Sequence, residues 1–345
     1  MEEWVGTVGP FGSVRPMTPS HPVEPQVPPT GPRAVTTDPA RHRPARRLVL
    51  GARSYDITTR ALVMGILNRT PDSFYDRGAT FALDALVRRA DEMVADGVDL
   101  FDVGGVKAGP GPEVSEAEEL DRVLTTVVAV HARFDVPISV DTWRASVARE
   151  AFAAGAVLGN DISGFGDPDY LPVAAAAGAS VVATHIRLAP RVADPDPVYV
   201  DVVATVAAFL RTRAGRARGA GIPADRIMVD AGLDLGKTAV QSERLLRASD
   251  TLAAIGYPLL LSASNKTFLG VLFGLEIGER RSASLAAAAL GVSRGCRVLR
   301  VHDVAGTRRV RDAIAAVLEA REGEDGASQR EGHDRHRRTA ADGEL

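Results

Sequence analysis

The chain has 345 residues, of which 45% are hydrophobic and 25% are charged, as expected of a soluble globular protein. Its formal net charge of −3 gives no basic field for nucleic acid or membrane lipid, and its single cysteine, Cys296, excludes a disulfide framework and fits a reducing cytoplasm. No apolar run approaches the roughly 18 residues that span a bilayer. The first residues also lack the basic and then apolar pattern of a signal peptide. We therefore expect a cytoplasmic protein that binds neither nucleic acid nor membrane.

Both ends of the sequence are expected to lie outside the folded part. Residues 1–45 contain ten of the 21 prolines, and proline removes backbone donors and disfavours helix. Residues 322–345 contain no Val, Ile, Phe or Met. Neither segment has the apolar residues to build a core. The sequence thus predicts one domain over 46–321 between a disordered proline-rich tail and a disordered charged tail.

Eight short apolar runs alternate with helical patterns between these tails. The runs are apolar on both faces, which is typical of parallel strands buried on both sides, and they occupy 62–68, 100–105, 137–142, 157–163, 180–185, 227–232, 257–264 and 297–304. Apolar residues at helical spacing predict helices over 81–97, 113–133, 198–218, 238–255, 280–294 and 306–321. Eight strand–helix units in a chain of this length favour an α/β fold of the (β/α)8 TIM barrel type over an open doubly wound sheet.

Polar residues gather where the apolar runs end, and active sites of such barrels lie at the C-terminal ends of the strands. The residues at these ends are Asn68, Gly104, Asp141, Asn160, Asp161, His185, Asp230, Lys266, Arg300, His302 and Asp303. Single members of this set have structural explanations. Asp161 and Asp303 suit helix caps, His185 suits a core histidine and Arg300 suits a pair with a nearby carboxylate. Ordinary strand ends do not collect all of these residue types together, so we expect a binding site.

Four of these residues suit a flat heterocycle with a guanidine-like edge, such as a pterin. Asp141 and Asp230 offer carboxylates that accept hydrogen bonds from a planar pair of N–H donors. Asn160 offers both a donor and an acceptor, and Lys266 offers a charged donor for a carbonyl oxygen or a ring nitrogen. The sequence therefore predicts a pterin-like ligand at this rim of the barrel.

The remaining strand ends suit a phosphate-bearing group. Arg300 and His302 begin the last strand–helix unit, where barrels often bind phosphate with the help of a helix N-terminus. Asn68 offers an oxygen ligand to a Mg²⁺ ion that bridges a diphosphate. No cluster of Cys and His supports zinc.

An ordered set of motifs resembles the dihydropteroate synthase family over about residues 62–320. The motifs are MGILNRTPDSFYDRG, FDVGG, ISVDT, GNDISG, DAGLDLGKT, SNKTF and RVHDV. The resemblance implies a transferase of folate biosynthesis that condenses 6-hydroxymethyl-7,8-dihydropterin diphosphate with 4-aminobenzoate and releases pyrophosphate. It also implies a homodimer formed through the last helices.

The resemblance assigns roles to individual residues. It implies that Asp141, Asn160, Asp230 and Lys266 bind the pterin, with Lys266 also catalytic. It implies that Arg300 and His302 bind the diphosphate and that Asn68 binds Mg²⁺. In the first loop, Asp76 would stabilise the pterin-methyl cation and, with Phe74, would order the arylamine pocket.

The departures from the family pattern fall on the arylamine and diphosphate side. Ala108 and Gly109 stand where the family has Thr and Arg, and Asn265 stands where it has a further Arg. The sixth-strand motif has Ala231 for Pro, and its DLG loop is poorer in glycine and aromatic residues than usual. An interaction with a charged group is worth about 1.5–3 kcal/mol, so two lost arginines lower kcat/KM by orders of magnitude. The pattern resembles the divergent second dihydropteroate-synthase-like paralogue of actinobacteria.

Three functions remain open at this point. The first is a dihydropteroate synthase of weakened activity, favoured by the complete pterin-binding set. The second is a pterin-binding paralogue without synthase turnover, favoured by the lost arginines. The third is a related pterin-barrel methyltransferase acting on methyltetrahydrofolate, which shares the pterin site but has no use for the RVHDV and TPDSF motifs.

Overall fold

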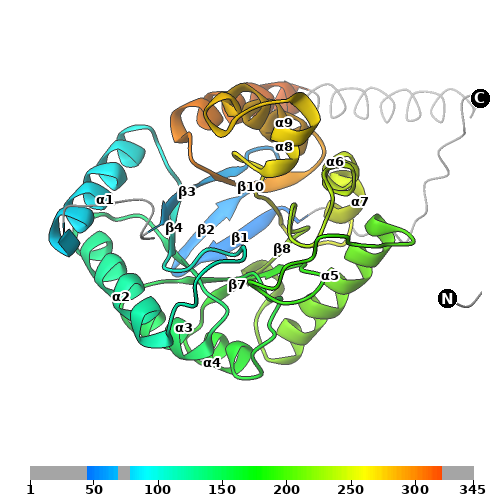
Figure 1. Cartoon of the computed structure of the whole chain (residues 1–345). Helices are drawn as coiled ribbons and strands as arrows, with labels where there is room; N and C mark the ends of the chain where they lie inside the picture. Colours follow the sequence, from blue (N-terminus) through cyan, green and yellow to red (C-terminus); the bar gives the residue numbers. More distant parts are fainter. Residues whose placement is uncertain (1–44, 69–77, 321–345) are drawn as a thin grey trace, which may run out of the picture. The chain divides into compact units, whose positions relative to one another are not determined.

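The computed structural model describes residues 45–68 and 78–320. Eight parallel strands close into a barrel in the order β10-β3-β4-β5-β6-β7-β8-β9, and Figure 1 shows them at the centre of a ring of helices. The barrel strands are β3 (Leu62–Asn68), β4 (Leu100–Gly104), β5 (Ile138–Asp141), β6 (Leu158–Asp161), β7 (Ser180–Thr184), β8 (Ile227–Asp230), β9 (Leu259–Leu261) and β10 (Cys296–Val301). The predicted TIM barrel is confirmed, and both predicted tails fall almost entirely outside the described residues.

The helices cover the outer face of the barrel. They are α1 (Gly78–Ala95), α2 (Glu116–Arg133), α3 (Ala145–Ala153), α4 (Tyr170–Ala176), α5 (Val202–Gly219), α6 (Ala239–Arg247), α7 (Ser249–Ala253), α8 (Thr267–Phe273), α9 (Arg281–Ser293) and a last helix over 304–320. Short 3-10 turns lie at Ala224–Arg226 and Ile277–Glu279. The helix predicted over 238–255 is divided into α6 and α7. Within the described ranges no helix is long and apolar enough to cross a membrane.

A β-hairpin closes the N-terminal end of the barrel and was not predicted from the sequence. Its strands are β1 (Arg47–Leu50) and β2 (Arg53–Asp56). Leu48, Leu50 and Ile57 are fully buried and pack against the interior residues near the starts of the barrel strands. The hydroxyl of Ser180 also donates to the Val49 carbonyl at 2.6 Å. The hairpin therefore fills the end of the barrel that lies opposite the predicted site.

Candidate active site

The two-residue alternation of the strands turns the polar strand ends toward the barrel interior. In β4, Leu100 belongs to the interior cluster, so Asp102, two residues later, faces the same way. The same step leads from an interior hydrophobic residue to Asn160 in β6, to Asp230 in β8 and to Arg300 in β10. The alternate residues pack outward against the helices. Period-two patterning thus gathers these side chains at one end of the barrel.

Strand register places three of the predicted residues in one row. Asn68 is level with Gly104, Gly104 with Asp141, and Asp141 with Asn160. A Cβ atom at Gly104 would lie 2.8 Å from Asn68 Oδ1 and 3.7 Å from Asp141 Oδ2. Only glycine therefore leaves room at this position, and the two oxygens face a common space above it.

Arg300 links two carboxylates in the centre of the site. Its Nε lies 2.5 Å from Asp102 Oδ2 and its Nη2 lies 2.8 Å from Asp141 Oδ2. The amide Nδ2 of Asn160 lies 3.3 Å from Asp102 Oδ2. We refer to Asp102, Asp141, Asn160, Asp230 and Arg300 as the inner-face set. Arg300 here pairs with carboxylates, the alternative raised for it from the sequence, and its predicted role at a diphosphate stays a prediction.

Asp102 was missed as a site residue. It is fully buried, and its carboxylate is the common partner of Arg300 and Asn160. The signal was present in the motif FDVGG, where one charged residue interrupts an apolar strand at the position that alternates inward.

Burial governs the protonation of the inner-face set. It raises the pKa of Asp141 to about 7, although the charge of Arg300 acts in the opposite direction. Burial also raises the pKa of Asp230, while the N–H of Gly232, donated at 2.8 Å, favours its ionised form. Burial lowers the pKa of Lys266, and the nearby carboxylates of Asp234, Asp230 and Asp141 oppose that shift. The site therefore holds closely balanced charges that a ligand can shift.

Lys237 shapes the loop between β8 and α6 and was also missed. Its amine donates to the carbonyl oxygens of Gly232 at 2.8 Å, Leu235 at 2.9 Å and His185 at 3.2 Å, and lies 2.9 Å from His185 Nδ1. Burial lowers the pKa of Lys237 to about 7, and burial together with Lys237 lowers that of His185 to about 3. His185 is thus a neutral core histidine, one of the two explanations open from the sequence. The sequence signal for Lys237 was its position in DLGKT, between a glycine and a threonine that caps the next helix.

His302 and Ser264 form a polar pair at the end of β10. The Ser264 hydroxyl accepts the backbone N–H of His302 at 3.2 Å and lies 3.0 Å from its Nδ1. Arg89 of α1 donates to the His302 carbonyl at 2.8 Å. Burial and the positive charges of Arg300 and Arg89 lower the pKa of His302 to about 4. A neutral imidazole accepting the Ser264 proton at Nδ1 carries its own proton on Nε2, ready to donate to an anion.

The two strand-end aspartates with structural explanations act as turn and helix caps. Both carboxylate oxygens of Asp161 accept backbone N–H groups, from Ser163 at 2.7 Å and Phe165 at 2.8 Å. Asp303 Oδ1 accepts the N–H of Gly306 at 2.9 Å, at the start of the last helix. Neither residue was assigned a role in ligand binding.

The residues that depart from the family pattern lie in loops around the same rim. A Cβ atom at Gly109 would meet nothing within 4 Å, so a side chain fits there. Asn265 has a left-handed backbone with φ 57°, and its N–H donates to Ser284 Oγ at 3.0 Å. The backbone N–H of Arg191, in the β7–α5 loop, donates a hydrogen bond to the Ala108 carbonyl at 3.0 Å. Phe74 and Asp76, the predicted arylamine and cation-stabilising residues, lie outside the described residues.

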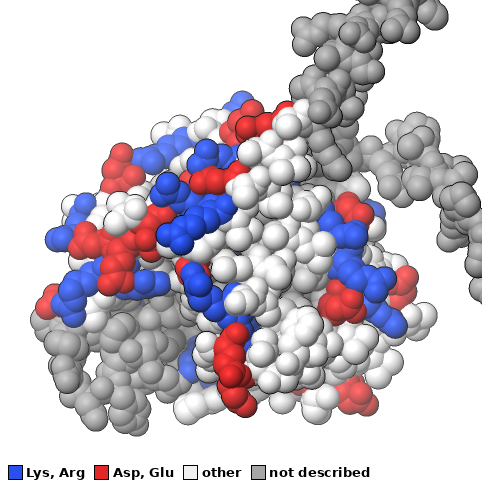
Figure 2. All heavy atoms as spheres, turned by 90° about the horizontal axis from the view of Figure 1, so that it is seen from above, with Lys and Arg blue, Asp and Glu red and all other residues white. Residues whose placement is uncertain are grey.

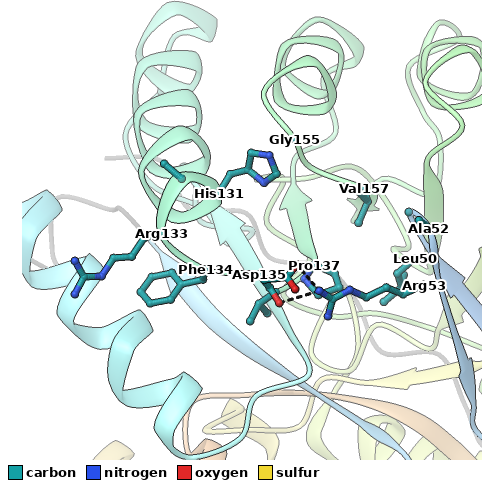
Figure 3. A pocket seen from close by; sticks show the side chains of 13 residues that line it. Leu50, Ala52, Arg53, His131, Arg133, Phe134, Asp135, Pro137, Gly155 and Val157 are labelled. Atoms are coloured by element: carbon teal, nitrogen blue, oxygen red, sulfur yellow. Dashed lines mark hydrogen bonds and ion pairs between the residues drawn. The ribbon is translucent and has the colours of Figure 1, made fainter.

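Another hollow lies at the opposite end of the barrel. It has a volume of about 460 Å³ between the β1–β2 hairpin and the α2–β5 loop, and Figure 3 shows Arg53 and Asp135 paired across it. His131, Phe134 and Val157 also line it. None of the inner-face set reaches this hollow, and conserved chemistry in such barrels lies at the C-terminal face. We therefore assign it no part in the site.

The comparisons with known proteins agree with this geometry. A family model described as pterin binding enzyme matches residues 64–302, and the chain belongs to that family. A protein named inactive dihydropteroate synthase 2 from Mycobacterium leprae is 44% identical over 75% of this chain and 91% of its own length. The dihydropteroate synthase of Haemophilus influenzae is 39% identical over 71% of this chain and 90% of its own.

Solved structures are similar over most of the barrel. The Yersinia pestis dihydropteroate synthase with a sulfonamide drug complex gives a TM-score of 0.74 at 36% identity, covering 79% of this chain and 99% of that one. The Xanthomonas albilineans enzyme in complex with 7,8-dihydropteroate gives 0.71 at 37% identity, covering 79% and 98%. The chain is therefore of the dihydropteroate synthase type, and its relatives include proteins named dihydropteroate synthase and proteins named inactive dihydropteroate synthase 2.

Proposed function

We propose that this protein binds 6-hydroxymethyl-7,8-dihydropterin diphosphate and transfers its pterin-methyl group to an arylamine, with weak turnover on 4-aminobenzoate. The observation that carries the proposal is the inner-face set. A pterin edge offers two parallel N–H donors, the same arrangement that the Arg300 guanidinium offers to Asp102 and Asp141. The pterin can therefore replace Arg300 as the hydrogen-bond donor to these two carboxylates. The guanidinium of Arg300 would then be free to bind the diphosphate.

The transfer asks for positioning and charge stabilisation more than covalent chemistry by the protein. The bond from the methylene carbon to the diphosphate oxygen breaks first and leaves a pterin-methyl cation, and the amine nitrogen then forms a bond to that carbon. The diphosphate leaves with the electron pair, and the amine gives up a proton to solvent. Arg300 and the Nε2–H of His302 would stabilise the charge on the leaving diphosphate, while Lys266 and Asp230 hold the pterin ring.

Magnesium fits this arrangement as a further proposal. Asn68 Oδ1 and Asp141 Oδ2 both face the space above Gly104, and Mg²⁺ takes oxygen ligands while keeping several waters and substrate phosphates. Within 45–68 and 78–320, no group of three or more His, Cys, Asp or Glu is arranged to hold a metal by protein ligands alone. Asn68 would thus hold the ion together with the diphosphate, and the ion would supply charge neutralisation at the leaving group.

A second candidate is a pterin-binding protein without synthase turnover. Gly109 and Asn265 favour it because they replace cationic side chains of the family pattern, and so does the name of the Mycobacterium leprae relative. Both candidates require pterin binding and differ in turnover.

The experiment that separates them measures pyrophosphate release from dihydropterin diphosphate with Mg²⁺, with and without 4-aminobenzoate. We expect slow release that depends on 4-aminobenzoate, and faster release by a Gly109→Arg, Asn265→Arg double variant. The single variant Gly109→Arg is the control that shows how much of any gain comes from the second arginine, at position 265. Pterin binding with no release by either protein would leave the binding-protein candidate.

We also propose a homodimer formed through α8 and α9, in the cytoplasm. Val271, Phe273 and Ile277 are 66%, 63% and 67% exposed, and Figure 2 shows a broad uncharged area on the face over these helices. An apolar hollow of about 450 Å³ between α6, α8 and α9 adjoins it. Exposed apolar patches of this kind mark interaction surfaces, and a second copy of the chain is the commonest partner. The cytoplasmic location rests on the single, buried cysteine.

A further inference from the structure

A cavity of about 270 Å³ lies among loops at the C-terminal ends of the strands, and none of the inner-face set lines it. Its walls come from three loops that follow β4, β7 and β8, with Gly109, Ile186, Leu188, Val192 and Leu235 among them. These loops extend from the C-terminal ends of the strands, where the inner-face set also lies. The apolar walls suit a flat aromatic ring.

Among the described residues that line the cavity, the one cation is already engaged. Lys237 is the only lysine or arginine among the described residues that line it, and its amine is already surrounded by three carbonyl oxygens and His185 Nδ1. The other charged lining residues are Asp194 and Asp234. Arg187 holds Asp194 through two contacts of 2.5 Å, so that guanidinium is also engaged.

Asp234 lines the cavity, and its charge favours the protonated form of Lys266 against the burial that lowers the pKa of that amine. The backbone of Asp234 has φ 66°, a left-handed conformation that favours glycine. Its Oδ2 accepts the N–H of Phe268 at 3.3 Å, in the first turn of α8, and its Oδ1 accepts the Ser242 hydroxyl at 3.3 Å. Lys266 is the N-cap residue of α8 and makes no capping bond with its side chain. Asp234 therefore caps α8 from another loop and takes up an N–H group that an anionic ligand would otherwise use.

The neighbouring positions remove positive charge from the same region. Gly109 lines the cavity where the family pattern has arginine, and Asn265 adjoins Lys266 where the pattern has a second arginine. A carboxylate entering the cavity would thus meet Asp234 without the two arginines of the family pattern. Like charges brought together in a partly buried site repel strongly.

We propose that this cavity receives the second substrate and that the substrate is an arylamine without a carboxylate, neutral or cationic, selected by Asp234. The inference rests on the proposed transferase function. The transfer is unchanged: the amine nitrogen bonds to the methylene carbon, the diphosphate leaves with the electron pair and the amine loses one proton. Asp234 acts as a specificity-determining residue and takes no part in the bond changes.

The test compares 4-aminobenzamide with 4-aminobenzoate, in which a neutral amide and a charged carboxylate of similar size occupy the same ring position. The full-length protein is first titrated with 6-hydroxymethylpterin and inorganic diphosphate by calorimetry. Each amine is then titrated into the saturated protein, so the measurement does not depend on turnover. We expect 4-aminobenzamide to bind at least about tenfold more tightly, and Asp234→Asn to reduce that preference about tenfold.

Two further variants complete the test. Asp234→Gly suits the left-handed backbone and removes the same charge, so it replaces Asp234→Asn if that variant fails to fold. Asp225→Asn removes one half-buried carboxylate, paired with Arg47 at the opposite end of the barrel, and should leave the preference unchanged. Pterin binding with equal or tighter binding of 4-aminobenzoate, or with binding of neither amine, overturns this inference and leaves the pterin site intact. Failure of the pterin itself to bind overturns both the inference and the proposed function.

Discussion

Burial and the charge of Arg300 act in opposite directions on the Asp141 carboxylate, and burial is the stronger of the two. Its pKa rises from 3.8 to about 7. The folded protein therefore binds a proton that the unfolded chain has already lost between these values, and this group makes the free protein less stable as pH rises through that window. Ligand binding has the opposite dependence, because only the ionised carboxylate accepts a donor on each oxygen.

The first prediction follows from that shift. Affinity for 6-hydroxymethylpterin should rise with pH by up to about tenfold per unit below the pKa of Asp141, and level off above it. Calorimetric titrations between about pH 5.5 and 8.5 measure this dependence. Asp141→Asn should bind about 10–100-fold more weakly and lose most of the pH dependence, since a charged hydrogen bond is worth about 1.5–3 kcal/mol. A variant with the slope of the wild type would place the titrating proton elsewhere.

The buried Lys237 and the half-buried Lys266 at the rim have different roles. Lys237 donates to three carbonyl oxygens of the chain itself, whereas the surroundings of Lys266 are the carboxylates of Asp234, Asp230 and Asp141. The second prediction is that Lys237→Met lowers the free energy of unfolding by about 1–3 kcal/mol, because buried carbonyls lose their donor.

Lys266→Met is the matched variant for this comparison. It should reduce pterin affinity while changing the free energy of unfolding by less than Lys237→Met does. Urea unfolding and pterin titration of both variants measure the two effects. Equal destabilisation by the two substitutions would contradict the division of tasks.

At the scale of elements, the β1–β2 hairpin adds buried apolar side chains to the barrel interior without touching the site. Leu50 is 1% exposed and belongs to the interior cluster, whereas Arg53 in the same hairpin is an exposed residue paired with Asp135. The third prediction is that Leu50→Ala lowers the free energy of unfolding by about 2–5 kcal/mol with pterin affinity unchanged. Arg53→Ala should change stability by at most about 1 kcal/mol. A change in pterin affinity on Leu50→Ala would show coupling along the barrel axis.

The predictability of each element followed the strength of its local signal. The barrel strands were predicted to within a few residues because runs such as LVMGILN are buried on both faces and have no helical period. The helices α3, α4 and α8 were not predicted. They have nine, seven and seven residues, too few for a helical period of apolar residues to be recognised. The hairpin was missed because Arg53 and Ser54 interrupt its apolar residues. It gains its stability from the barrel interior, which is a tertiary effect.

The candidate site was predictable where single strand ends carried the signal, and less so where partners mattered. Asp141, Asn160 and Asp230 are the last or next-to-last residues of their strands, as expected. Asp102 lies before the strand end and is recognised as a site residue only through Arg300 and Asn160. The role of Asp234 depends on its hydrogen bond with the N–H of Phe268, a residue 34 positions away in the sequence. Contacts across such separations leave no local pattern in a single sequence.

At the scale of the whole molecule, the proposed dimer explains why the face over α8 and α9 exposes apolar side chains. The apolar α8 residues Val271 and Phe273 are exposed on the described protomer. Lys266 is the N-cap residue of the same helix, and Asp234 accepts an N–H group of its first turn. An interface formed through α8 would therefore fix the position of this helix and of Lys266 at its start. Dimer formation would in this way affect the geometry of the pterin site.

The fourth prediction tests that interface. Phe273→Glu should convert a dimer into a monomer, because it buries a charge in an apolar contact, and light scattering after size-exclusion chromatography measures the mass. Val128→Glu is the matched control, since Val128 is 56% exposed on α2 and lies outside α8 and α9. If α8 is held by the interface, the monomeric variant should also bind pterin more weakly. A wild-type protein that is monomeric at all concentrations would contradict the dimer and leave the face over α8 and α9 for another partner.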